Sequence, residues 1–368
     1  MHVQPPIPLR GPTPFRPKAE QARRCPQPSP RHASGDPLIT IAVPTRNRAK
    51  LLQDCVASAL AQTYRNIEVL VSDNASTDET AAVLDAIADK RLRVIRNDEN
   101  IGMVRNFARC VEEASGDYLV LVADDNILDP GFLEKCVSLV RQEPGIPIVL
   151  ALYEMHVLNE FADNETRLIP ALASKKLTTG IWDGTEILDE YLTGRLSSQL
   201  LSSIIRTDIL RRNGYSTHPC AGDEATWIPV LLEGRAGLVN ERCATYLVHD
   251  GSQSAAFSAD SRFLDLCAVM QEISLAAGRL QDPVKRKKVQ RLTSRYVAHQ
   301  AMITLVIYRR SGASLADVAR KVRKWRPKLA QCTWSDILAV LKLRSLGRIL
   351  LPASLARASM AVGLDRVF

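Results

Sequence analysis

The sequence predicts an α/β protein with a mainly parallel sheet, helices on both faces of that sheet and a helical extension at the C-terminal end. Three observations lead to this fold class. Apolar runs of strand length alternate with amphipathic segments from residue 38 to 152, a pattern typical of βαβ units with right-handed crossovers. Residues 118–122 have no polar face, as expected of a central strand covered on both sides. After residue 260, apolar and basic residues mix at helical spacing.

The individual elements follow from local signals. Strands are expected at residues 38–43, 67–72, 91–96, 118–122 and 146–152, with Pro44 ending the first. Four helices are expected in the first half of the chain. The first covers residues 51–64, and the second begins at a capping box of Ser76 and Glu79 and runs to about Lys90. The third follows the turn at 97–102 and runs through Glu113, and the fourth runs from Pro130 to about Arg141. Loop and short strands are expected over 159–179. A helix at 207–213 should end at Gly214, and another should begin near Asp223.

Composition and charge narrow the class of protein. The chain has 368 residues, 46% of them hydrophobic and 24% charged, which is ordinary for a soluble globular protein. The net charge of +8 is uneven: residues 1–36 hold 6 Lys and Arg against 2 Asp and Glu, and residues 280–368 hold 19 against 4. Residues 37–279 are therefore acidic, with 23 against 34. Without a zinc-finger spacing or an RNA-binding aromatic motif, nucleic acid is not an expected partner.

The two ends of the chain differ from its centre. Residues 1–36 are rich in Pro and poor in apolar clusters, so we expect a disordered leader or an over-extended start. Residues 256–368 are expected to be helical and basic. Two interpretations of these helices are open: contact with an anionic membrane face, at about 1 kcal/mol for each basic residue, or packing on the acidic domain. The 8 Cys form no CxxC pair, and no apolar run is long enough to span a bilayer. Both indicate a cytoplasmic protein with reduced thiols, in peripheral membrane contact at most.

The most distinctive stretch is an acidic turn. The apolar strand at 118–122 stops at Asp124 and Asp125, and ligands of open α/β sheets bind beyond the carboxyl ends of the strands. Two carboxylates there suit Mg²⁺ or Mn²⁺ held partly by protein and partly by phosphate oxygens. The alternative is an acidic loop that caps the next helix, with Asp129 and Pro130 as its start signal.

Five motifs in order carry a resemblance to a known family. They are VPTRNR (43–48), QTYRNIE (62–68), SDNASTD (72–78), NIG (100–102) with Asn106, and GDYLVLVADDN (116–126). Neither a GxGxxG nor a GxxxxGK[ST] motif is present, so dinucleotide-binding and P-loop proteins are not indicated. Over roughly residues 38–255 the chain resembles family 2 glycosyltransferases, the inverting type with the Rossmann-like GT-A fold, found in bacterial surface-polysaccharide synthesis.

The resemblance implies roles for individual residues. Asp125 and His249 would hold a divalent cation, Mn²⁺ or Mg²⁺. A structural alternative is open for Asp73, an Asx turn, and for Arg105, an exposed helical position; for Asp78 we favour a helix-terminal charge. The residues implied to bind the nucleotide sugar are Pro44, Thr45, Arg46, Asn47, Asp73, Asn74, Arg105 and Asp124.

A second centre is expected in residues 221–234. Inverting transfer to a hydroxyl group needs a carboxylate that accepts the acceptor's proton, and the resemblance implies an Asp or Glu at the start of a helix here. Asp223 and Glu224 both qualify, and we favour Asp223. The alternative is a plain helix N-cap with a charge near the helix dipole. His249 lies in a His-x-x-Ser-x-Ser stretch, where Ser252 and Ser254 would help to hold a loop over the donor.

The implied activity is transfer of a sugar from a nucleotide-diphosphate sugar to a hydroxyl acceptor, such as a lipid-linked saccharide or another precursor of a cell-surface glycan. Residues 37–152 would bind the nucleotide sugar and residues 153–255 the acceptor. One rival is a nucleotidyltransferase, which needs a Gly-rich phosphate loop that PTRNR (44–48) lacks. Another is a scaffold protein that binds nucleotide sugars without catalysis.

Overall fold

The computed structural model describes residues 36–158, 166–249, 258–310, 312 and 314–329. Within them, a mixed sheet of ten strands has the order β3-β2-β1-β4-β9-β6-β10-β5, with β7 paired to β6 and β8 to β10. The strands are β1 (Ile39–Thr45), β2 (Ile67–Asp73), β3 (Leu92–Arg96), β4 (Tyr118–Leu121), β5 (Ile127–Leu128), β6 (Ile148–Leu158), β7 (Thr166–Ile169), β8 (Gly180–Asp183), β9 (Ser203–Arg206) and β10 (Arg235–Val248).

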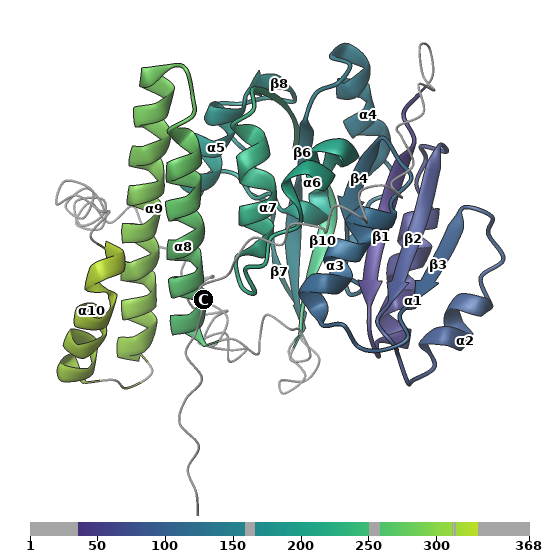
Figure 1. Ribbon diagram of the computed structural model, residues 1–368, viewed down its shortest axis with the longest axis horizontal. Helices are drawn as coiled ribbons and strands as arrows, with labels where there is room; N and C mark the ends of the chain where they lie inside the picture. The colour runs from purple at the N-terminus through teal and green to yellow at the C-terminus, as the bar shows by residue number, and fades with distance from the viewer. Residues whose placement is uncertain (1–35, 159–165, 250–257, 311, 313, 330–368) are drawn as a thin grey trace, which may run out of the picture.

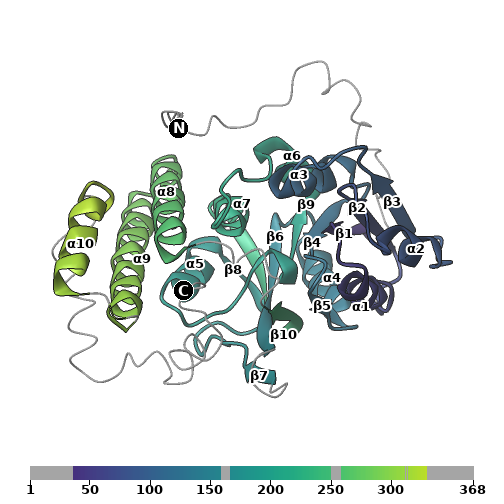
Figure 2. The same cartoon turned by 90° about the horizontal axis from the view of Figure 1, so that it is seen from below.

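Helices cover both faces of this sheet. In Figure 2, α3 and α6 lie on one face and α1 and α4 on the other. Two buried apolar clusters fill the space between the layers. The α-helices are α1 (Ala49–Leu60), α2 (Thr80–Asp85), α3 (Met103–Glu113), α4 (Phe132–Gln142), α5 (Gly184–Leu192), α6 (Thr207–Asn213), α7 (Gly222–Leu231), α8 (Ala259–Ala277), α9 (Pro283–Arg310) and α10 (Leu315–Leu329).

The predicted fold class is confirmed. Strands β1 to β4 are mutually parallel in the order β3-β2-β1-β4, so their carboxyl ends meet at one edge of the sheet. The sheet becomes mixed beyond β4, because β9 runs antiparallel to both β4 and β6. Gly214 ends α6 with φ 78°, as its sequence position predicted.

One predicted strand end is wrong. Pro44 lies inside β1, opposite Ser72 of β2, rather than ending the strand. The pairing of β1 with β4 stops at Ala42, so the missing N–H of Pro44 removes no ladder hydrogen bond on that side. The sequence does not reveal this, because it does not show how far each neighbouring strand extends.

The capping box predicted for the second helix is also wrong. The helix α2 is shorter than expected, and no side chain of Glu79 caps it. Instead Asp78 accepts hydrogen bonds from the backbone N–H of Thr80 and of Ala49, at 3.1 Å each. The interpretation of Asp78 as a helix-terminal charge is therefore confirmed, and one carboxylate stabilises the starts of α1 and α2.

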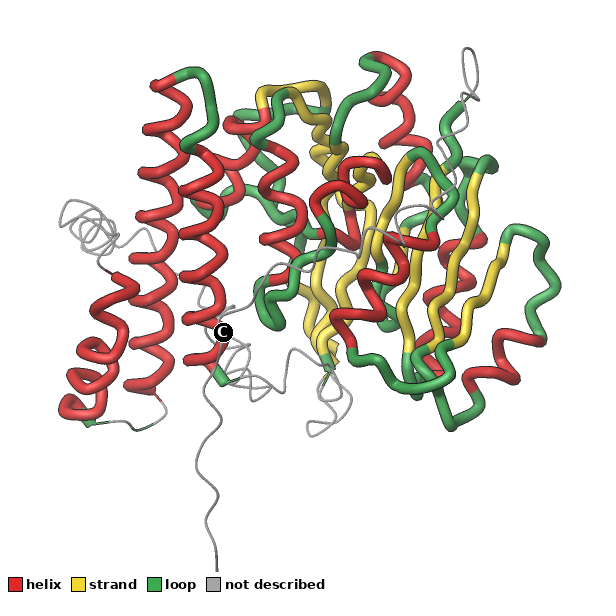
Figure 3. Tube along the Cα trace, in the orientation of Figure 1, coloured by secondary structure: helices red, strands yellow, loops and turns green. Residues whose placement is uncertain are grey.

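The C-terminal helices extend the molecule sideways. Figure 1 shows α7, α8, α9 and α10 one after another beside the sheet, and Figure 3 shows the same stack as helical tube. The aromatic rings of Phe263 and Trp325 pack 4.3 Å apart and join α10 to α8. These helices are therefore packed on the sheet domain through α7 and α5.

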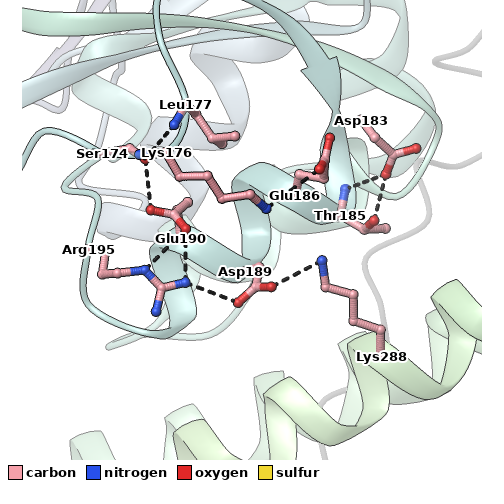
Figure 4. Close-up of polar contacts among 10 residues, drawn as sticks. All are labelled: Ser174, Lys176, Leu177, Asp183, Thr185, Glu186, Asp189, Glu190, Arg195 and Lys288. Atoms are coloured by element: carbon pink, nitrogen blue, oxygen red, sulfur yellow. Dashed lines mark hydrogen bonds and ion pairs between the residues drawn. The ribbon is translucent and has the colours of Figure 1, made fainter.

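Basic residues at the start of α9 face acidic residues of α5 and its N-cap residue, Asp183. Lys288 Nζ lies 3.0 Å from Asp189 Oδ2 (Figure 4), and Lys285 pairs with Asp183. Glu190, on the same helix, pairs with Arg195 at 2.9 Å. The expected packing of a basic tail on an acidic domain is observed for these lysines. The basic segment at 337–351 lies outside the described residues.

Two further expectations concern membranes and thiols. In the part of the chain that the structure describes, no helix has the length and apolar character needed to cross a bilayer. The described cysteines are free thiols, all buried except the partly exposed Cys220. This agrees with the interpretation of the cysteines as structural thiols.

Candidate active site

The acidic turn lies at the edge of the sheet where β1, β2 and β4 end. Asp124 and Asp125 are buried, with 5% and 7% of their surfaces exposed. The hydroxyl group of Thr45 donates to Asp124 Oδ2 at 2.7 Å. Arg48 Nη1 lies 3.0 Å from Asp124 Oδ1 and 2.9 Å from Asp125 Oδ2. One guanidinium therefore joins the two carboxylates, a contact that the sequence analysis did not foresee.

The far end of β10 completes this group. His249 directly follows β10, and its Nε2 lies 3.3 Å from Asp125 Oδ2. The N–H of Leu247 donates to Asn126 Oδ1 at 3.0 Å, and β5 pairs with β10 at Thr245. These bonds hold β10 against the acidic turn, so the expected partners Asp125 and His249 do meet.

The charges at this edge favour a cation. Burial raises the pKa of Asp124 against the opposing charge of Arg48, and the charge of Asp125 raises it further. Burial lowers the pKa of Arg48, but the negative charges of Asp124 and Asp125 have the larger combined effect. The pKa of Arg48 is therefore above its ordinary value. Two buried carboxylates that already hold a guanidinium attract positive charge.

Asp125 and His249 are the side chains that would hold a divalent ion at this edge. Among the described residues, no group of three or more His, Cys, Asp or Glu side chains converges as a metal cage. Two protein donors leave the remaining positions to phosphate oxygens and water, which is a usual arrangement for Mg²⁺.

At the end of β2, the side chains are used for loop structure. Asp73 Oδ1 accepts from the N–H of Ser76 at 3.0 Å, so the Asx turn considered for Asp73 is present. Asn74 is buried and bonds to Asn97 and Asn100. Asn47 has φ 54° and accepts from the N–H of Thr77 at 2.8 Å. These bonds fix the two loops beside the acidic turn.

The remaining residues predicted to bind the nucleotide sugar make fewer contacts with the acidic turn. Pro44 is buried near the carboxyl end of β1, whereas Arg46 lies on the exposed loop that follows the strand. Arg105 is exposed on α3, as the structural alternative for it expected. The described contacts do not join Arg46 or Arg105 to Asp124 or Asp125.

The second predicted centre lies in the first turn of α7. The hydroxyl of Tyr191 donates to Glu224 Oε1 at 3.1 Å, and that of Tyr215 donates to Asp223. Burial and then the charge of Glu224 raise the pKa of Asp223 to about 7, and burial raises the pKa of Glu224 too. The N-cap of α7 is Ala221, without a side-chain cap. Neither carboxylate is therefore the N-cap, but both lie in the first turn, so the part of the alternative that placed a negative charge near the helix N-terminus is present.

A clamp from α8 holds the segment that leads into α7. Asp265 accepts from the N–H of Cys220 at 2.8 Å and of Ala221 at 2.9 Å, and from His218 Nδ1 at 2.7 Å. His218 Nε2 lies 3.2 Å from Glu272, so both ring nitrogens face carboxylates and the pKa of His218 is raised, chiefly by its bond to Asp265. Local sequence signals do not reveal this group, because the two partners of His218 are 47 and 54 residues away.

Asp265→Ala is expected to destabilise the protein by about 1 to 3 kcal/mol, because it leaves two N–H groups and one imidazole without their acceptor. Glu272→Ala is the matched control on the same helix. Its side chain is 62% exposed, so its ion pair contributes less than about 1 kcal/mol. Urea unfolding followed by circular dichroism measures both. An equal loss of unfolding free energy in the two variants would contradict the role of Asp265 in holding the segment before α7.

Comparison with known proteins agrees with this geometry. Residues 40–188 match the family model described as glycosyl transferase family 2. An uncharacterized glycosyltransferase of Haemophilus influenzae is 25% identical over 232 residues, 60% of this chain and 69% of that protein. The glycosyltransferase GlyG of Streptococcus pneumoniae is 33% identical over 118 residues, covering 32% of this chain and 39% of that protein.

The fold is similar to that of solved structures. The structure of residues 1–349 of S. aureus TarS in complex with UDP matches with a TM-score of 0.60 at 16% identity, over 84% of this chain and 85% of that chain. The same protein in complex with UDP-GlcNAc matches with a TM-score of 0.59 at 16% identity, over 82% and 81%. At this identity the likeness concerns the fold.

Proposed function

This chain is a family 2 glycosyltransferase with a GT-A fold, and from that premise we propose that it moves a sugar from a nucleotide-diphosphate donor to a hydroxyl group of a glycan precursor, with inversion. The donor would lie at the edge formed by Thr45, Asp73, Asp124 and Asp125. The acceptor would lie beside Asp223 and Glu224. The structural neighbours in complex with UDP and UDP-GlcNAc support a nucleotide-sugar donor.

One observation carries the proposal: β10 contacts the acidic turn at its end and, through Tyr246 and Tyr153, connects that turn to the surroundings of Glu224 and Asp223. Its end holds His249 beside Asp125. Three residues earlier, Tyr246 packs edge to face on Tyr153, whose pKa is raised by burial and also by the charges of Glu224 and Asp223.

Each of the acidic residues would have a separate role in binding or catalysis. Asp124, bonded to Thr45 and Arg48, would orient hydroxyl groups of the ribose or sugar. Asp223 would accept the proton of the attacking acceptor hydroxyl, since a base with a pKa near the working pH is the most effective. Glu224 would hold a neighbouring hydroxyl. A cation on Asp125 and His249 would supply charge neutralisation for the leaving diphosphate.

The rate of transfer should depend on pH through Asp223. Its pKa of about 7 predicts that kcat/KM rises as pH increases through about 7, because only the carboxylate accepts a proton. In Glu224→Gln the rise of kcat/KM should occur at lower pH, because the variant lacks the negative charge that raises the pKa of Asp223. Initial rates at low acceptor concentration between pH 5 and 9 measure both pH dependences. A wild-type profile that is flat over this range would exclude Asp223 as the base.

The experiment that tests the function is thermal unfolding of the full chain with UDP-, dTDP-, GDP- and CMP-activated sugars, with and without Mn²⁺. A ligand that binds the native state raises the melting temperature. Stabilisation by one nucleotide class, followed by transfer from that donor to a glycan, supports the enzyme. If no nucleotide sugar stabilises the chain under any condition, the donor site is wrongly assigned.

Contact with an anionic membrane face is the remaining part of the proposal. Exposed basic residues of α10, Arg320, Arg323 and Lys324, are not needed for the packing of α9 on α5. They would place a lipid-linked acceptor near the protein by electrostatic attraction. Sedimentation with phosphatidylglycerol vesicles, against phosphatidylcholine vesicles, tests this contact.

A further inference from the structure

The helix α7 begins without a side-chain cap of its own. Its N-cap is Ala221, and Asp223 and Glu224 lie in its first turn. In contrast, the N-caps of α5 and α8 are Asp183 and Ser258, whose side chains accept hydrogen bonds from the first turn that follows each of them. The backbone N–H groups at the start of a helix need acceptors from elsewhere when the N-cap supplies none. The partner that α7 uses therefore determines how its first turn, and with it Asp223, is held.

Asp265 of α8 is that partner. Its Oδ2 accepts from the N–H groups of Cys220, at 2.8 Å, and Ala221, at 2.9 Å, and its Oδ1 lies 2.7 Å from His218 Nδ1. Burial opposes the charge of Asp265, yet the hydrogen bonds from His218, Ala221 and Cys220 hold its pKa below the usual value. The carboxylate is therefore ionised at neutral pH, and charge-assisted hydrogen bonds of this kind are about twice as strong as neutral ones.

The loop before α7 is bonded to α7 itself. The N–H of Ser216 donates to Thr226 Oγ1 at 3.2 Å, and the hydroxyl of Thr226 donates to the carbonyl of Gly222 at 2.6 Å. The hydroxyl of Tyr215 donates to Asp223. The loop and the first turn of α7 therefore form one connected unit, and a shift at its contact with α8 is passed on to Asp223.

Asp265 acts on the two carboxylates of α7 from a distance. In the described part of the chain its hydrogen bonds go to the segment before α7 and to His218, and not to Asp223 or Glu224. Burial raises the pKa of Glu224, and the negative charge of Asp265 raises it further. The influence of Asp265 therefore passes through the backbone of residues 220–221 and through its charge.

We propose that Asp265 is a positioning residue for sugar transfer: by holding Cys220 and Ala221, it keeps the first turn of α7 in the place where Asp223 meets the acceptor hydroxyl. This assignment rests on the proposed function, since it takes Asp223 as the base. It gives the C-terminal helices a part in the reaction, because α8 carries the side chain that fixes the catalytic turn.

The test follows the protonation of Asp223 by NMR in the full chain, labelled with ¹³C at its aspartate carboxyl carbons. The signal of Asp223 is the one that is absent from Asp223→Asn. In the wild type its midpoint is expected near pH 7, because burial and the charge of Glu224 raise the pKa of Asp223 to about 7. In Asp265→Ala the midpoint should fall to about pH 6 or lower, because the released turn exposes Asp223 to water, which favours the charged form.

Two further variants make this test specific. Asp265→Asn should keep the wild-type midpoint, because its amide oxygen still accepts from both N–H groups and its NH₂ group can donate to a neutral His218. Glu272→Ala is the control on the same helix, because its exposed carboxylate faces His218 rather than a backbone N–H group, and it should also keep the wild-type midpoint. The proposal is overturned if the midpoint is unchanged in Asp265→Ala, or if it falls as far in Asp265→Asn or Glu272→Ala.

The rate of transfer gives a second readout. Asp265→Ala should lower kcat by up to about a hundredfold, the loss that a displacement of about 1 Å can cause, whereas thermal stabilisation by the nucleotide sugar should match that of the wild type. If a nucleotide sugar stabilises the chain but the midpoint of Asp223 does not move in Asp265→Ala, the positioning role fails and the glycosyltransferase stands. If no nucleotide sugar stabilises the chain, the donor site fails, and the titration still decides whether Asp265 holds Asp223.

Discussion

Asp223→Asn is expected to lower the rate of sugar transfer about a thousandfold, the range contributed by a positioned general base. The change is nearly isosteric, and the amide can still accept the hydrogen bond that the Tyr215 hydroxyl donates to Asp223. It removes only the ability to take up a proton. The measurement is the initial rate of transfer at saturating donor and acceptor.

The control for this prediction is binding of the donor. Asp223 lies on α7, apart from the contacts among Thr45, Arg48 and Asp124. Stabilisation by the nucleotide sugar should therefore be the same in Asp223→Asn and in the wild type. A variant that keeps more than about a tenth of the wild-type rate would show that another group takes the proton, and Glu224 is the first to examine.

Asp125→Ala is expected to abolish the Mn²⁺-dependent part of the thermal stabilisation by the nucleotide sugar. At a donor concentration of about 100 times Kd, binding contributes about 2.7 kcal/mol to stability, equivalent to a shift of roughly 5 °C for a chain of this size. The variant should show no such shift, because the cation loses its buried carboxylate and His249 alone holds it weakly. Differential scanning fluorimetry with and without Mn²⁺ measures this loss.

Asp129→Asn provides a matched control in the same turn. Its carboxylate pairs with Arg242 at 3.2 Å and is more exposed than that of Asp125, so the donor shift should remain. An unchanged Mn²⁺-dependent shift in Asp125→Ala would remove Asp125 from the cation site. The bridging Arg48 would then be the positive charge of this edge.

Much of the fold was predictable because its signals are local. Strand-length apolar runs, helical spacing and the glycine after α6 each depend on residues a few positions apart. The carboxylates at the end of β4 were found in the same way, whereas those at the start of α7 were implied by the family resemblance. The errors at Pro44 and at the capping box of α2 have the opposite cause: the pairing limit of β4 and the bond from Asp78 to Ala49 depend on other strands and helices.

The sequence by itself determined the alternation of strands and helices up to about residue 152 and indicated the two pairs of carboxylates. The tertiary structure alone decided which further side chains contact the two centres that hold those carboxylates. Arg48 reaches Asp125 across 77 residues, and Asp265 reaches Ala221 across 44. Such contacts arise from strand pairing and shared burial, which bring together residues that no short stretch of sequence connects.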